Sequence, residues 1–199
     1  MEMRRPVGGM QLAARLRGVS PPVTRRLLIE EQASLSRLHA VLQVAFGWSG
    51  EHLYTFQIRG WQFANPARAL NLALSGGGAD IPLAAFGFEI GESFLYQYSL
   101  SIPWGIDCRV KARALIDAST PVVCLAARGH VPDEDLPGPS AYPDWFTDSE
   151  PCWVLHQIQQ MLDEDLDEER FRAEARDILT QARRTPANRR VISNRLQQL

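Results

Sequence analysis

One strong helix pattern, set between segments that alternate like strands, is the feature that most constrains this chain. Apolar residues recur at helical spacing over Leu35–Phe46, with Ser34 placed as an N-cap and Gly47 as the stop. Strand-like alternation precedes this helix over residues 11–30 and follows it over residues 53–63. Because the helix is the nearest element able to cover the apolar strand faces, the pattern predicts an α+β fold.

The alternating segments predict two hairpins, one helical turn and three further strands. In chain order these elements fall at residues 11–17, 23–30, 53–59, 61–63, 81–88 (the helical turn), 93–100, 106–115 and 120–126. The strictest alternation runs over residues 106–115, and the segment at 120–126 is its expected partner across a short turn.

The order of the first elements resembles a known fold. Hairpin, helix, short hairpin, helical turn and strand follow one another, with Leu-x-x-Phe-Gly-Phe-x-x-Gly-Glu-x-Phe-x-Tyr-x-Tyr at residues 83–98. This order resembles the β-grasp fold of ubiquitin-like domains. The resemblance implies a β-grasp core sheet packed on one helix, extended by further antiparallel strands.

The last third of the chain has a different character. Residues 129–145 are rich in proline, glycine and acid and predict a loop. Apolar stripes predict one helix from Pro151 and a second over residues 167–182, followed by a polar tail that frays or forms a third short helix. We therefore expect an α+β domain at residues 1–148 and a helical C-terminal extension at residues 149–199, packed on it.

The formal net charge of -2 conceals segregated charges. Residues 1–30 hold six arginines and two glutamates, residues 131–170 hold twelve acidic residues and one basic residue, and residues 171–199 hold seven arginines and two acids. Two interpretations stay open: the arginines pair with the acidic segment or face solvent, or they contact nucleic-acid phosphates. The candidate phosphate contacts are Arg183, Arg184, Arg189, Arg190 and Arg195.

The sequence carries no complete catalytic signature. Cys108, Cys124 and Cys152 are widely spaced and belong to no disulfide, metal or nucleophile motif. The chain has no Walker loop, dinucleotide fingerprint or Gly-x-Ser-x-Gly elbow, so we expect no catalytic residues, metal or cofactor. The consecutive acids at residues 133–135 leave a divalent-metal hydrolase open as an alternative to a solvated loop.

Aromatic and polar residues at the ends of expected elements indicate a binding groove. Aromatic side chains in loops line grooves that hold peptides or bases, although the same rings can simply cap the core. The candidate groove residues are Trp48, His52, Tyr54, Trp104, Asp133, Glu134 and Tyr142.

Three segments carry a resemblance to a known family. They are Leu-Arg-Gly-Val-Ser-Pro-Pro-Val-Thr-Arg-Arg-Leu at residues 16–27, the helix ending in Gly-Trp at residues 35–48, and His-Leu-Tyr-Thr-Phe at residues 52–56. On these segments the chain resembles the plasmid pRiA4b ORF-3-like proteins, which include insertion-element passenger proteins labelled TnpR. The resemblance implies an architecture and a plasmid or mobile-element setting. Resolvase chemistry, which the label suggests, is rejected because no serine stands among clustered arginines.

The chain departs from that family's pattern in two places. Where the family has Tyr-Asp-Phe-Gly-Asp-Gly-Trp-x-His, residues 98–107 keep Trp104 but lose the aspartates and the histidine. Where the family has Cys-Pro-Pro-Glu-Asp, Val131 replaces the cysteine, although proline and acids persist at residues 132–135. The resemblance therefore implies that any chemistry done by those polar groups is lost here.

These observations together predict a non-enzymatic interaction module that binds a protein or peptide. Nucleic-acid binding through the arginines, with DNA as the partner, and metal-dependent hydrolysis are the alternatives. No apolar run approaches the roughly 20 residues that cross a bilayer, and Met1–Pro6 lacks the apolar core of a secretory signal. We therefore expect a cytoplasmic protein with no membrane partner, while its oligomeric state stays open.

Overall fold

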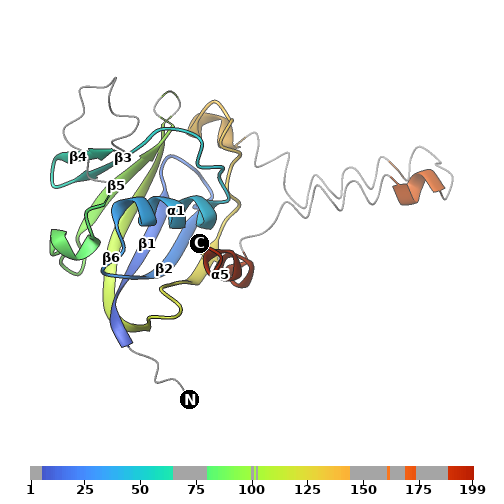
Figure 1. Ribbon diagram of the computed structural model, residues 1–199. Coiled ribbons are helices and arrows are strands. Elements are labelled where there is room, and N and C mark those ends of the chain that lie inside the picture. The colour runs from blue at the N-terminus through green and yellow to red at the C-terminus, as the bar shows by residue number, and fades with distance from the viewer. Residues whose placement is uncertain are drawn as a thin grey trace, which may run out of the picture.

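A seven-stranded sheet dominates the structure (Figure 1). The computed structural model describes residues 6–64, 80–99, 101, 103–143, 161, 169–173 and 188–199. Within them the strands are β1 Pro6–Leu16, β2 Thr24–Glu30, β3 Tyr54–Ile58, β4 Trp61–Ala64, β5 Ser93–Tyr98, β6 Trp104–Asp117 and β7 Val122–Arg128. The strand order is β4-β3-β5-β6-β1-β2-β7, and every neighbouring pair is antiparallel. The expected α+β class is therefore confirmed.

The main helix, α1 Leu35–Phe46, begins and ends where the sequence predicts. Ser34 Oγ accepts a hydrogen bond from the Arg37 N–H at 3.1 Å, which satisfies one of the free amides of the first turn. Gly47 takes the left-handed conformation at φ 72°, which costs glycine little, and its N–H bonds back to Gln43 O. The apolar stripe of α1 packs on one face of the sheet and forms the core (Figure 1).

A buried arginine joins α1 to the sheet. Arg25 on β2 points under the helix, where its Nε donates to Ala45 O at 2.7 Å and its Nη1 donates to Thr24 O and Arg128 O. Its guanidinium also lies 5.3 Å from the centroid of the Phe46 ring. Burial lowers the pKa of Arg25 to about 10, so the group stays charged at neutral pH. Its charged guanidinium satisfies the Ala45 carbonyl near the C-terminal end of α1.

Strand pairing differs from the sequence-based expectation at one point. The segment expected to pair with residues 106–115 is β7, but β7 pairs with β2, and β6 lies between β5 and β1. The β1–β2 hairpin therefore separates two strands that are adjacent in sequence. The specific β-grasp arrangement is not confirmed, since β6 stands between β1 and β5 in an entirely antiparallel sheet.

The polar tail forms a short helix, which is one of the two structures that the sequence predicts for it. This helix, α5 Arg189–Leu196, buries Ile192 and Leu196 in the core on the same side of the sheet as α1 (Figure 1). The expected helix from Pro151, most of the one over residues 167–182, and the domain boundary at residue 148 lie outside the described residues. Two 3-10 turns, η2 Leu83–Phe86 and η3 Pro139–Ala141, complete the described elements, and η2 lies in the helical turn expected at residues 81–88. No helix in the described part of the chain is long and apolar enough to span a membrane.

Candidate functional site

The structure brings four of the seven candidate groove residues together around a tyrosine that the sequence did not single out. The Trp48 ring stacks on Tyr98 at 5.3 Å between centroids, and His52 meets Tyr98 edge-on at 5.4 Å. Trp104 lies against Trp48, with 6.1 Å between the ring centroids. Glu134 accepts a hydrogen bond from the Tyr98 hydroxyl at 2.8 Å. Strand alternation places Tyr98 on the core face with Phe94 and Tyr96, and this pattern could have marked Tyr98 as a core residue from the sequence.

These contacts fix a loop to the core, and we call Trp48, Tyr98, Trp104 and Glu134 the loop anchor. Trp48 Nε1 donates to Pro132 O and Trp104 Nε1 donates to Glu134 O, both at 3.1 Å. The Glu134 carboxylate also accepts the Ser49 N–H at 2.9 Å. Two indoles and one carboxylate thus hold residues 132–134 against the end of α1.

The loop anchor also sets the charge state of its carboxylate. Partial burial by itself would raise the pKa of Glu134. Hydrogen bonds from Tyr98 and Ser49 outweigh that effect, and the nearby His52 adds to them, so the pKa lies below its usual value. The ionised form is therefore the one that the anchor holds at neutral pH.

The aromatic rings of the candidate set lie within the protein rather than on its surface. Trp104 and Tyr142 are fully buried, and Trp48 and Tyr54 are each 7% exposed. Tyr142 donates its hydroxyl proton to His130 O at 2.9 Å. The accessible members of the set are His52, Asp133 and Glu134, whose role in binding a partner stays a prediction.

Tyr54 belongs to a second polar network beneath α1. The His39 ring stacks on Tyr54 with 3.7 Å between centroids, and its Nδ1 lies 2.8 Å from the Tyr96 hydroxyl. Gln43 Nε2 donates to the same hydroxyl at 2.6 Å. Burial lowers the pKa of His39 to about 4, so the ring is neutral at pH 7. In the tautomer that carries the ring proton on Nε2, Nδ1 accepts the Tyr96 proton. Neither His39 nor Gln43 was a candidate from the sequence.

The three consecutive acids do not converge on a common point. Glu134 is engaged by Tyr98 and Ser49, while Asp133 Oδ1 accepts the Asp135 N–H at 3.1 Å in a local turn. Among the described residues, no group of three or more His, Cys, Asp or Glu side chains is arranged to hold a metal ion. The metal-hydrolase alternative therefore has no support from this loop.

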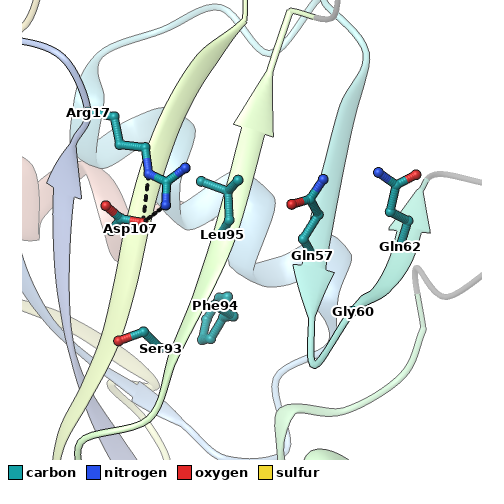
Figure 2. A pocket seen from close by; sticks show the side chains of 8 residues that line it. All are labelled: Arg17, Gln57, Gly60, Gln62, Ser93, Phe94, Leu95 and Asp107. Atoms are coloured by element: carbon teal, nitrogen blue, oxygen red, sulfur yellow. Dashed lines mark hydrogen bonds and ion pairs between the residues drawn. The ribbon is translucent and has the colours of Figure 1, made fainter.

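The face of the sheet opposite α1 holds a shallow hollow of about 460 Å³ (Figure 2). Figure 2 shows Leu95 beside the Arg17–Asp107 pair, with Gln57 and Gln62 on the two strands beyond it and α1 behind the strands. Arg17 Nε and Nη2 lie 2.8 and 2.7 Å from Asp107 Oδ1. The sequence did not mark this surface, because its residues come from five separate segments. The remaining residues that line the hollow are Gly60, Ser93 and Phe94.

The arginines proposed for nucleic acid fall partly outside the described chain. Arg183 and Arg184 are not among the described residues, whereas Arg189, Arg190 and Arg195 are exposed on α5. Arg189 Nη1 donates to Leu125 O on β7 at 3.3 Å. These three side chains therefore share one helix on the α1 side of the sheet.

The arrangement defines an α+β protein built on one antiparallel sheet, with helices on one face, an opposite face that no described helix covers, and a loop held by two indoles. The chain belongs to the plasmid pRiA4b ORF-3-like protein family, whose model matches residues 9–175. The family that the sequence resembles is thus confirmed, while the insertion-element setting stays a prediction.

Two relatives bear on this assignment. The chain is 31% identical over 146 residues to the uncharacterized protein y4hQ of Sinorhizobium fredii, covering 68% of this chain and 70% of the relative. It also resembles the crystal structure of MM3350, a protein of unknown function from Methanosarcina mazei Go1, with a TM-score of 0.59 and 17% identity. That similarity covers 82% of this chain and 86% of MM3350, and it supports the fold alone.

Proposed function

We propose that the chain is a non-enzymatic binding module that takes up an extended peptide segment of a protein partner along the outer edge of β4, which pairs with no further described strand. The observation that carries this proposal is Trp61, a large aromatic residue at the start of an edge strand, with 67% of its surface exposed. Tryptophan is one of the residue types that contribute most binding energy in protein interfaces.

The geometry of the hairpin directs main-chain groups outward at this edge. Ile58 pairs with Trp61 across the two-residue turn Arg59–Gly60, whose φ values of 49° and 82° are those of a tight hairpin. In such a hairpin the pair beside the turn exchanges both hydrogen bonds, so the N–H and C=O of Gln62 point away from β3. An added strand would bond to Gln62 and lay a side chain against Trp61.

The opposite edge of the sheet, β7, is covered by α5, and this difference supports the choice of β4. Along β7, Ser193 of α5 accepts the Cys124 N–H at 3.1 Å and donates to Cys124 O at 3.2 Å. This hydroxyl occupies the groups that a further strand would need, and covering an edge in this way is how proteins avoid unwanted pairing. Among the described residues, no comparable cover lies on β4.

We place the contact at β4 rather than at the expected aromatic groove because the groove rings are occupied. Trp48 and Trp104 are buried and use their indole N–H groups on the chain's own carbonyls. His52 and Asp133 remain accessible beside them and would enlarge a partner contact without anchoring it.

A displayed library of extended peptides, selected against the full chain, tests this proposal. Selected peptides should lose about 30-fold or more in affinity for Trp61→Ala, the loss typical of a removed anchor. Gln62→Pro should lose affinity as well, because it removes an outward N–H while leaving the β3 pairing intact.

The matched control is Leu115→Ala, since Leu115 is 73% exposed on a different strand. This variant should bind the selected peptides like the original chain. The proposal fails if no peptide is selected, or if the selected peptides bind Trp61→Ala and Gln62→Pro as tightly as the original chain while circular dichroism shows both variants folded.

A further inference from the structure

A continuous row of residues crosses the open face of the sheet. The pairing register places one residue from each strand side by side, in the order Gln62, Gln57, Leu95, Asp107, Arg15, Thr24 and Arg128. All of them point away from α1: on β1, β2, β3, β5 and β6 their strand neighbours carry buried side chains, and cross-strand pairing with Gln57 and Thr24 puts Gln62 and Arg128 on the same face. The hollow of Figure 2 lies in the β4, β3, β5 and β6 part of this row.

Arginines gather in the other part of the open face. In the next row, Arg109 of β6 and Arg26 of β2 stand on either side of Ala13. Strands lie about 4.8 Å apart, so Arg26 and Arg109 are separated by about 10 Å across the small alanine. With Arg15 and Arg128 beside them, four exposed arginines share a compact area that we call the arginine face.

The arginine face has little acid to neutralise it. Asp107 is the acidic residue of these two rows, and it is paired with Arg17. No hydrogen bond or ion pair joins the side chains of Arg15, Arg26 or Arg128 to another described residue. Arg109 donates its Nε to Gly91 O at 2.9 Å, on the β5 side of β6, and the other guanidinium nitrogens make no hydrogen bond to a described residue. The positive charge is therefore directed outward.

We propose that the open sheet face binds a strand of single-stranded nucleic acid, with phosphates on the arginine face and bases over the glutamine half. Guanidinium groups match phosphate oxygens in a two-point geometry, and their neutralisation of phosphates releases counterions. The amides of Gln57, Gln62 and Gln97 both donate and accept hydrogen bonds, as base edges and sugars require. This activity uses the face of the sheet rather than the β4 edge; Gln62 borders both, through its side chain on the face and its main chain at the edge, and the arginine contacts do not depend on peptide binding.

A nucleic-acid strand fits the chemistry of this face better than a protein does. The cores of protein interfaces are depleted of charge and depend on apolar anchors, whereas Leu95 is the one large apolar side chain in the two rows described. Nucleic-acid interfaces are more polar and much more positive. A single strand is favoured over a duplex because, among the described elements, none projects from this sheet face as a helix or ribbon that could enter a groove.

Salt-dependent binding of a fluorescent single-stranded oligonucleotide of about 20 nucleotides to the full chain provides the test. The variant carries Arg15→Gln, Arg26→Gln and Arg128→Gln. It should bind roughly tenfold more weakly or worse at about 50 mM salt, and its slope of log affinity against log salt should be smaller by about 2, since each lost phosphate contact removes about 0.7.

The matched control removes the same charge from the helix side of the sheet through Arg37→Gln, Arg190→Gln and Arg195→Gln. That control should keep the affinity and most of the slope. Equal losses in both variants would show that net charge alone matters and would overturn the proposal. Absence of binding at low salt, or tighter binding of a duplex of the same length, would overturn it as well.

Discussion

At the scale of single residues, Arg25 shows how one buried charge can hold two elements together. Its guanidinium serves carbonyls of Ala45 and Arg128, which are 20 and 103 residues away in sequence. Sequence patterns place Arg25 in a strand, but they do not reveal these distant acceptors. Local signals behaved differently: Ser34 and Gly47 cap α1 through neighbours within a few residues, so both were predictable.

The first prediction concerns this arginine. Arg25→Ala should lower the free energy of unfolding by about 3 kcal/mol, because it leaves buried carbonyls without donors. Urea denaturation followed by circular dichroism measures the loss. The adjacent Arg26→Ala, on an exposed position, should change stability by no more than about 0.5 kcal/mol. Equal effects of the two substitutions would contradict the role given to Arg25.

A second prediction at this scale follows from His39. The unfolded chain protonates this histidine near pH 6.5, whereas burial lowers the pKa in the folded protein to about 4. The unfolded state therefore binds more protons between these values, and stability falls as pH drops from 6.5 to 4. The loss should reach about 2 kcal/mol, once partial exposure of the ring to water is allowed for.

Urea denaturation at a series of pH values checks this expectation. His39→Gln keeps an acceptor for Tyr96 but cannot take up a proton in this range. Its unfolding free energy should therefore vary less than that of the original chain between pH 6.5 and 4. An unchanged pH profile would exclude His39 as the source.

At the scale of elements, α5 acts as the cover of the β7 edge. Ser193→Ala should cost about 1 to 2 kcal/mol, because Cys124 loses partners for both its N–H and its C=O. Removal of residues 188–199 should uncover the strand and cause self-association, which sedimentation velocity detects. Asn194→Ala, at an exposed position of the same helix, is the control and should leave stability and mass unchanged. A monomeric truncated chain would contradict the role of α5 as an edge cover.

Element type was easier to predict from the sequence than element pairing. The strand at residues 106–115 follows from alternation alone and extends by only two residues at each end in β6 Trp104–Asp117. Its neighbours depend on where the β1–β2 hairpin inserts, and periodicity contains no information on that order. The pairing of β7 with β2 therefore had to come from the structure.

At the scale of the whole molecule, the sheet divides the protein into unlike sides. One side carries α1, α5 and the core, and the other carries the exposed glutamines and the arginine face. Sequence reasoning found basic segments near both ends of the chain, but it could not show that Arg15, Arg26, Arg109 and Arg128 share a surface. Four strands, adjacent only after folding, supply these residues. The sequence correctly grouped Trp48, His52 and Trp104, which lie together in the structure. It did not predict that the two tryptophans are buried, because their burial depends on the loop that covers them.

The two tryptophans of the loop anchor hold backbone atoms rather than side chains. Both indoles donate to main-chain oxygens, at Pro132 and Glu134, so exposed side chains nearby, such as that of Asp135, take no part in either indole contact. The backbone path of the loop at Pro132 and Glu134 therefore depends little on which exposed side chains the loop carries. Substitution of an exposed residue at this tip, such as Asp135, should therefore leave both indole contacts in place.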